Sequence, residues 1–182
     1  MKIIKTKIPD LLIIEPNVFA DDRGYFFETY NEEKYKTEGI NNSFVQDNEA
    51  LSSYGVIRGL HYQLDPYAQA KLVRVVKGSV YDVAVDLRKN SPTYLEWVGV
   101  ELSAQNKRQF IVPRGFAHGY SVLEDDTLFV YKCDNFYNKE AERSISPLDK
   151  TLNIDWKIPE DKLVFSPKDL ENPFLDKAEY NF

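Results

Sequence analysis

The chain contains two histidines, His61 and His118, and their scarcity restricts its chemistry more than any other feature. A metal site with three histidine ligands cannot be built within one chain. Two histidines are still enough for a site that uses two histidines and one carboxylate. The single cysteine, Cys133, excludes an internal disulfide and a cysteine-rich zinc site. Each histidine is otherwise a candidate base or a core residue satisfied by hydrogen bonds.

The residues around each histidine favour a barrel without a metal. His118 lies in PRGFAHG at residues 113–119, which has the P-x-G-x-x-H spacing of the second motif of cupin barrels. His61 lies in RGLHYQ at residues 58–63, where Gln63 stands in place of the second histidine of the H-x-H pair of metal-binding cupins. The sequence therefore predicts a cupin-type barrel and no metal ligands.

Further motifs follow in order along nearly the whole chain. They are RGLHYQ at 58–63, AKLVRV at 70–75, DVAVDLR at 82–88, SPT at 91–93, PRGFAHG at 113–119, YK at 131–132 and EAER at 140–143. In these motifs the chain resembles the dTDP-4-dehydrorhamnose 3,5-epimerase family. The resemblance implies a cofactor-free isomerase that converts dTDP-4-dehydro-6-deoxy-D-glucose to dTDP-4-dehydro-L-rhamnose. It places the chain in dTDP-L-rhamnose biosynthesis for lipopolysaccharide or cell-wall polysaccharide.

The implied reaction needs a base and a positive charge together. The hydrogens on C3 and C5 of the sugar are α to the ketone at C4, so a base removes either one to give an enolate, and reprotonation from the opposite face inverts the carbon. A histidine has a pKa of about 6.5, and a proton α to a ketone is a weaker acid by on the order of ten units, a mismatch of roughly 14 kcal/mol. The enolate oxygen therefore needs preorganised positive charge in a water-poor pocket. No hydride moves, and the sequence contains no G-x-G-x-x-G motif for a nicotinamide.

The resemblance assigns catalytic roles to a small set of residues. His61 is implied as the general base and Tyr131 as the acid that reprotonates the enolate, while Lys71 is implied to stabilise the enolate oxygen. Asp169 is implied to orient and polarise His61, and its sequence context also suits the third position of a short helix. Asp82 competes for the orienting role because it lies in a strand beside the motif.

The resemblance also assigns residues to the nucleotide and the sugar. Arginine suits a pyrophosphate because its planar fork makes bidentate contacts. Tyr137 is implied to stack on thymine, and His118 to hydrogen-bond the sugar or the catalytic pocket. The remaining implied ligand contacts are Arg23, Glu28, Gln46, Asp47, Asn48, Arg58, Glu142 and Lys168. Members of the family form homodimers in which the N-terminal segment reaches the neighbouring site, which implies that Arg23 and Glu28 act on the partner's substrate.

Two other functions remain open from the sequence. A relative that epimerises one carbon only, or that acts on another dTDP-sugar, would carry a similar base and acid. A cupin that binds sugars or nucleotides without catalysis, or a metal-dependent oxygenase, would share the barrel. The missing H-x-H pair disfavours the metal-dependent version.

Composition sets the wider limits. The 182 residues carry 29 acidic and 23 basic side chains, a net charge of −6, which disfavours a general nucleic-acid binder. An anionic ligand must therefore be held by a local cluster of basic side chains. No run approaches the roughly 20 apolar residues of a transmembrane helix, so we expect a cytoplasmic protein without a membrane contact. The length suits one domain over residues 1–182.

The elements that must position these residues are mostly strands. Valine-rich and aromatic runs predict strands at 11–15, 24–30, 71–76, 80–87, 97–102, 109–112 and 127–133. Gly78, between two of these runs, predicts a hairpin. A helix is predicted at 31–38 with Asn31 as its N-cap, and helix starts are predicted at Ser146 and Ser166, where Ser-Pro precedes an acid. Many short strands with few helices predict an all-β, cupin-like antiparallel jelly roll, a double-stranded β-helix with a few short peripheral helices.

Overall fold

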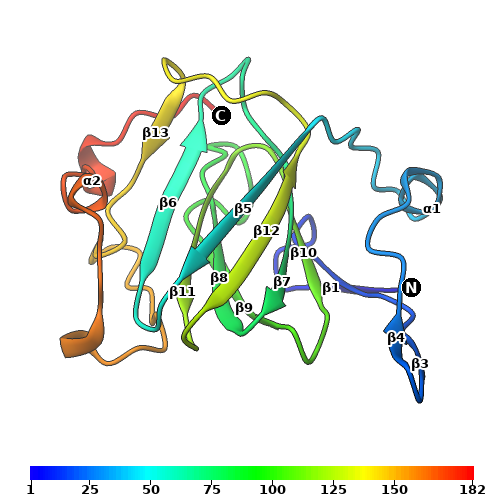
Figure 1. Ribbon diagram of the computed structural model, residues 1–182. Helices are drawn as coiled ribbons and strands as arrows, with labels where there is room; N and C mark the ends of the chain where they lie inside the picture. Colours follow the sequence, from blue (N-terminus) through cyan, green and yellow to red (C-terminus); the bar gives the residue numbers. More distant parts are fainter.

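Two antiparallel sheets face each other in the computed structural model, which describes residues 1–182 (Figure 1). The larger sheet has the strand order β1 (Lys2–Lys5), β2 (Leu12–Glu15), β10 (Gln109–Val112), β7 (Lys71–Lys77), β12 (Thr127–Cys133) and β5 (Gln46–Ser52). The smaller sheet has the order β13 (Glu142–Ser144), β6 (Ile57–Gln63), β11 (Phe116–Val122), β8 (Ser79–Asp86) and β9 (Trp97–Ser103). The strands β3 (Phe19–Asp21) and β4 (Gly24–Phe26) form a separate hairpin. The architecture is the all-β, cupin-like jelly roll that the sequence predicts.

Most predicted strands agree with the structure. The predictions at 109–112 and 127–133 match β10 and β12 in full, and those at 11–15, 71–76, 80–87 and 97–102 match β2, β7, β8 and β9 to within one residue at each end. The strand predicted at 24–30 is too long, because β4 ends at Phe26 and pairs only with the short β3. The sequence did not predict the short strands β1, β3 and β13. It also did not predict β5, β6 and β11, whose glycines, histidines and charged residues weaken the strand pattern.

The chain crosses from one sheet to the other at Gly78, so the predicted hairpin between β7 and β8 is wrong. β7 pairs with β10 and β12 in the larger sheet, whereas β8 pairs with β11 and β9 in the smaller one. Gly78 has a φ of 77°, and a Cβ at this position would clash with Thr127. Glycine therefore permits a close-packed corner here, and a glycine between two valine-rich runs does not distinguish such a corner from a hairpin.

Two short helices, α1 (Glu32–Thr37) and α2 (Pro167–Leu170), lie at the periphery, together with the 3₁₀ turns η1 (Glu160–Lys162) and η2 (Leu175–Lys177) (Figure 1). Two of the three predicted N-caps, Asn31 and Ser166, are confirmed. Asn31 Oδ1 accepts a hydrogen bond from the Lys34 N–H at 3.1 Å, and Ser166 Oγ accepts one from the Asp169 N–H at 3.1 Å. None of the helices has the length and apolar character needed to span a bilayer.

The helix start predicted at Ser146 is wrong, because the residues that follow it form turns. The Asp149 carboxylate accepts hydrogen bonds from the N–H groups of Thr151 at 2.8 Å and Leu152 at 3.1 Å, and from that of Leu175 at 2.7 Å. This buried acid therefore ties a turn to the C-terminal segment instead of capping a helix.

The main hydrophobic core fills the space between the two sheets. It includes Val73, Leu102, Phe110, Val122 and Phe129, all almost fully buried. Burying a side chain of this size stabilises the fold by about 1.5–3 kcal/mol. A second cluster packs on the other face of the smaller sheet beneath the C-terminal segment, and a third lies where α1 meets the larger sheet. The sheets are thus held rigidly on both faces, which suits them to position side chains between them.

Candidate active site

A cavity of about 310 Å³ lies between the two sheets and contains several of the predicted site residues. Its walls come from β5, β7 and β12 of the larger sheet and from β6 and β13 of the smaller one. Side chains alternate along a strand, so Gln46 and Asn48 of β5 point into it together, as do Tyr131 and Cys133 of β12. The lining residues are Gln46, Asn48, His61, Tyr62, Gln63, Gln69, Lys71, Tyr131, Cys133, Tyr137 and Glu142.

His61 on β6 is held by Asp169 of α2. The His61 Nε2–H donates to Asp169 Oδ1 at 2.8 Å, and Asp169 also accepts hydrogen bonds from Ser166 Oγ at 2.8 Å and Asn172 Nδ2 at 3.4 Å. Burial raises the pKa of the Asp169 carboxyl, but the hydrogen bonds from His61 and Ser166 outweigh it and hold that pKa below its usual value. A carboxylate that holds Nε2 as the N–H leaves the lone pair on Nδ1, where a base needs it.

Tyr131 and Lys71 stand on the opposite wall, on the neighbouring strands β12 and β7. Tyr131 shares its strand face with Phe129 and Cys133, as the alternation predicts, and its ring lies 5.9 Å from that of Phe129. The Lys71 ammonium lies 6.0 Å from the Tyr131 ring centroid and makes no hydrogen bond or ion pair. Burial raises the pKa of Tyr131 and lowers the pKa of Lys71. Tyr131 is therefore a neutral O–H donor, and the Lys71 side chain beside it has no ion-pair partner.

His118 is paired with Asp82 and not with Asp169. Its Nε2 lies 2.9 and 3.0 Å from the two carboxylate oxygens of Asp82, and both side chains are buried. Burial raises the pKa of Asp82 and lowers that of His118. His118 and His61 are directly opposite in the pairing of β11 with β6. The structure thus contains two separate His–Asp pairs side by side, and Asp169 is the acid that contacts His61.

Polar side chains form a connected rim at the mouth of the cavity. Glu142 Oε2 accepts hydrogen bonds from Lys168 Nζ at 2.8 Å and from the Tyr137 hydroxyl at 3.1 Å. Gln46 Oε1 accepts the Tyr137 N–H at 2.9 Å, and Gln46 Nε2 donates to Asn48 Oδ1 at 3.2 Å. The Tyr137 side chain is exposed. An aromatic face beside amide and ammonium groups is chemically suited to a nucleotide.

Known proteins share both the sequence and the fold of this chain. The family model described as dTDP-4-dehydrorhamnose 3,5-epimerase matches residues 5–177. The chain belongs to the dTDP-4-dehydrorhamnose 3,5-epimerase family. A member of that name from Shigella flexneri is 54% identical over 181 residues, which cover 99% of each chain.

Solved structures of the epimerase family have the same fold as this chain. The crystal structure of dTDP-4-dehydrorhamnose 3,5-epimerase from Elizabethkingia anophelis is 57% identical, with a TM-score of 0.93 over 98% of this chain and 99% of that one. The structure of the Legionella pneumophila dTDP-6-deoxy-D-glucose-3,5-epimerase, in complex with dTDP-4-keto-L-rhamnose, is 49% identical, with a TM-score of 0.94 over 98% of this chain and 94% of that one.

Two residues predicted to contact ligand in this epimerase lie away from the cavity of their own chain. Arg23 belongs to the exposed hairpin of β3 and β4, and its guanidinium pairs with Asp21 at 2.6 Å. Glu28 pairs with Lys34 at 2.6 Å near the start of α1. Neither residue lines the cavity that contains His61.

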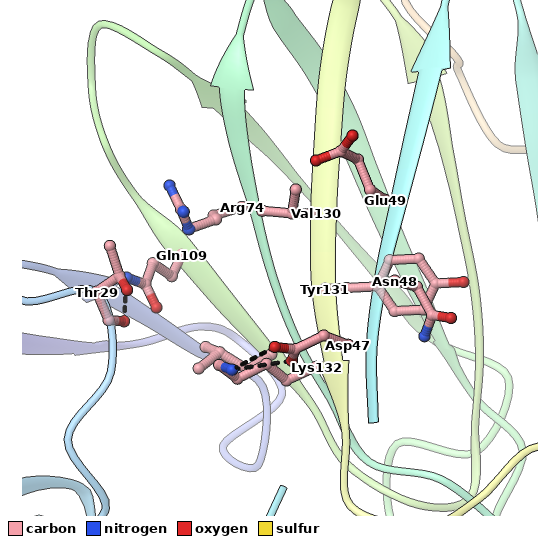
Figure 2. Close-up of a pocket in the computed structure, with 10 residues that line it drawn as sticks. Thr29, Asp47, Asn48, Glu49, Arg74, Gln109, Val130, Tyr131 and Lys132 are labelled. Atoms are coloured by element: carbon pink, nitrogen blue, oxygen red, sulfur yellow. Dashed lines mark hydrogen bonds and ion pairs between the residues drawn. The ribbon is translucent and has the colours of Figure 1, made fainter. Parts of the chain in front are cut away.

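Asp47 also points elsewhere, into a second cavity of about 390 Å³ on the outer face of the larger sheet (Figure 2). There its carboxylate pairs with Lys132 at 2.8 Å. Arg74 lines the same cavity without a hydrogen bond or ion pair, and burial lowers its pKa. Asn48 and Tyr131 line both cavities, so the two spaces share a wall.

Arg58 lies on β6 opposite Tyr120 of β11, outside the cavity lining. Its Nε–H donates to Ser52 Oγ at 3.1 Å. Its two terminal guanidinium nitrogens make no hydrogen bond within the chain. They are therefore free to bind an anion.

The sequence did not reveal some residues that support the site. The Ser-Pro motif predicted Ser166 as a helix cap, but not that its hydroxyl also binds the Asp169 carboxylate. Asn172 donates to the Gly59 carbonyl and to Asp169 at 3.4 Å, a link between distant segments that no local pattern signals.

Gln63 stands at the position of the second histidine of an H-x-H pair. Its side chain hydrogen-bonds to backbone groups of two loops. No group of three His, Cys, Asp or Glu side chains is arranged to hold a metal ion. The carboxylate and imidazole groups of the site are instead paired with each other, as His61 with Asp169 and His118 with Asp82.

Proposed function

We propose that this member of the epimerase family inverts C3 and C5 of dTDP-4-dehydro-6-deoxy-D-glucose through enolate intermediates, which yields dTDP-4-dehydro-L-rhamnose for dTDP-L-rhamnose biosynthesis. One observation carries the proposal: a single cavity has His61, paired with Asp169, on one wall and Tyr131 with Lys71 on the other. Inversion requires a base and an acid on opposite faces of the sugar, because the proton leaves one face and returns to the other.

In the proposed first half-reaction, His61 Nδ1 takes the proton from the carbon α to the ketone. The electron pair of the broken C–H bond moves into the ring, and the ketone oxygen becomes an enolate oxygen. Asp169 stabilises the imidazolium that forms, as the acid does in other base–orienter pairs. The short contact of 2.8 Å and the burial of Asp169 make that stabilisation strong.

Lys71 and Tyr131 act on the enolate. The Lys71 ammonium binds the enolate oxygen and stabilises its negative charge. The Tyr131 hydroxyl then donates its proton to the opposite face of the carbon, and the ketone re-forms. The phenolate regains a proton from solvent, and the imidazolium loses one to it. Cys133 stays a thiol because burial raises its pKa to about 11.

The nucleotide occupies the rim in this proposal. Tyr137 stacks on the thymine ring, and Gln46, Asn48 and Glu142 bind polar groups of the nucleoside. Lys168 and Arg58 bind the phosphates, and His118, opposite His61 on β11, hydrogen-bonds the sugar or the catalytic pocket. Asp47 points into the second cavity and has no contact at this rim within its own chain. The unpaired guanidinium nitrogens of Arg58 support this arrangement.

The proposal extends to a cytoplasmic homodimer of single-domain chains, each spanning residues 1–182, in which Arg23 and Glu28 reach the partner's substrate. Three features support it. The hairpin that carries Arg23 exposes Phe19, Tyr25 and Phe26. The strand β5 is an uncovered edge of the larger sheet. Arg74 makes no ion pair in the second cavity (Figure 2).

Hydrogen exchange tests the reaction. Wild-type protein incubated with the substrate in deuterated water should place deuterium on both C3 and C5, detected by proton NMR. Label at one carbon alone would assign the protein to the single-carbon epimerases. Absence of exchange at both carbons, in protein that binds dTDP, would support a non-catalytic binder and overturn the proposal.

Subunit complementation tests the exchanged arm. Arg23→Ala and His61→Ala proteins should each have low activity. After mixing and subunit exchange, the mixed dimer contains one site with both residues intact, so activity should recover to roughly a quarter of the wild-type level. No recovery, with mixed dimers demonstrated by mass spectrometry, would show that Arg23 does not act on the partner's site.

A further inference from the structure

Tyr137 lies on the loop between β12 and β13, and its side chain does little to fix its own position. It is 54% exposed, and its hydroxyl makes one hydrogen bond, to Glu142 Oε2 at 3.1 Å. The orientation of the ring therefore depends on how the backbone on either side of Tyr137 is held.

One buried side chain holds that backbone on both sides. Gln63 Nε2 donates to the Phe136 carbonyl at 3.2 Å, and Gln63 Oε1 accepts the Asn138 N–H at 2.7 Å. These two groups immediately flank Tyr137. The same Nε2 also donates to the Tyr67 carbonyl at 2.6 Å, which ties a second loop to the first.

Gln63 belongs to the strand that carries the proposed base. It follows His61 by two residues on β6, so the two side chains share a face, and it is 5% exposed. β6 is paired on both sides, with β13 and β11. In the pairing with β13, Gln63 is directly opposite Glu142, which binds the hydroxyl end of Tyr137. The loop that carries Tyr137 and the proposed catalytic base His61 are thus both held in place by the same strand, β6.

We propose that Gln63 is a positioning residue for nucleotide binding: by holding the backbone on both sides of Tyr137, it keeps the ring oriented to stack on the thymine of the substrate. Gln63 thereby sets KM with little effect on kcat. This inference rests on the proposed function, in which thymine stacks on Tyr137. A rigid ring pays less conformational entropy on binding than a mobile one, so the effect appears in affinity. The catalytic pair of His61 and Asp169 has no hydrogen bond to Gln63, so chemistry in the bound complex is preserved.

The first test is Gln63→Met, which keeps the length of the side chain and removes all three hydrogen bonds. We expect KM to rise about tenfold, with kcat within about threefold of wild type, and dTDP affinity measured by calorimetry to fall about tenfold. Gln69→Met is the matched control, because Gln69 also faces the cavity but donates only to the Asn135 carbonyl at 2.8 Å. Its effect on KM should be clearly smaller.

A double-mutant cycle separates positioning from a general loss of structure. In a Tyr137→Ala background, Gln63→Met should change KM by less than about twofold, since the ring it positions is gone. Equal effects of Gln63→Met with and without Tyr137, or a loss of kcat with KM unchanged, would overturn the inference. Gln63→Glu gives the same comparison if Gln63→Met fails to fold, because it keeps the volume and the acceptor for Asn138 but loses both donated bonds.

The calorimetric arm distinguishes the two proposals. Wild-type protein that binds dTDP without exchanging substrate hydrogen would end the epimerase proposal, while the comparison of Gln63 and Gln69 variants would still decide the positioning role. Wild-type protein that exchanges hydrogen at both carbons, with Gln63→Met unchanged in KM and dTDP affinity, would end the positioning proposal alone.

Discussion

Replacing Asp169 with asparagine tests the role of the His61 partner directly. The substitution keeps the size of the side chain and removes its charge. It also reverses the hydrogen-bond requirement, because an amide N–H aimed at Nε2 would move the imidazole proton to Nδ1. The lone pair would then face residue 169 instead of the substrate, and the imidazolium formed in the reaction would lose its counter-charge.

The size of the effect follows from the geometry. The Asp169 side chain is 6% exposed and the His61 side chain 33% exposed, with 2.8 Å between the bonded atoms. Unit charges about 4 Å apart interact by about 4 kcal/mol at an effective dielectric constant of about 20. Water that reaches the partly exposed imidazole screens this to about 3 kcal/mol. At about 1.4 kcal/mol per tenfold in rate, kcat should fall roughly 10²-fold.

The assay is the initial rate of deuterium entry at C3 and C5, with dTDP affinity measured in parallel. Affinity should change little, because Asp169 does not line the cavity. Ser166→Ala is the control, since it removes one hydrogen bond to Asp169 and the cap of α2 but keeps the carboxylate. It should lower the thermal midpoint and reduce kcat less than tenfold. A folded Asp169→Asn protein with kcat within threefold of wild type would refute the reasoning.

Two further outcomes follow from the opposite wall of the cavity. Tyr131→Phe should still wash hydrogen out of the substrate, because the base remains, but should lose inverted product; unchanged epimerisation would remove Tyr131 from the acid role. Lys71→Met should lower kcat about 10²–10³-fold by removing the enolate's counter-charge. It should nevertheless raise the thermal midpoint at pH 7, because burial lowers the pKa of Lys71 and the folded state bears the cost of its charge. Between that lowered pKa and the unfolded value of about 10.4, the unfolded chain binds the extra proton and wild-type stability rises with pH. The advantage of Lys71→Met should therefore shrink toward pH 10, and a lower midpoint at pH 7 would contradict this account.

Sequence patterns predicted the strands where local chemistry is strong. The valine-rich runs that became β7 and β8 and the aromatic run that became β12 were located to within a residue. The pairing of β7 and β8 was wrong, because Gly78 permits either a hairpin or a corner and only the second sheet decides between them. The helix start predicted at Ser146 was wrong for a related reason: its acid, Asp149, accepts the N–H group of the distant Leu175, a partner that no local pattern signals.

The candidate site shows the same division. The resemblance carried by the sequence motifs implied His61, Lys71 and Tyr131 as site residues, and the structure brings them into one cavity. It does not bring Arg23 and Glu28 there within one chain, and their role in a partner's site stays a prediction.

The sequence by itself determined the residue types available for chemistry: two histidines, a single cysteine and a set of motifs that specify the family. Only the tertiary structure decided which acid serves which histidine. His61 bonds to Asp169 across 108 residues of sequence, and His118 bonds to Asp82 across 36. The physical reason is that strand register and the docking of the C-terminal segment determine which side chains meet. Those are properties of packing between distant segments, and no local pattern encodes them.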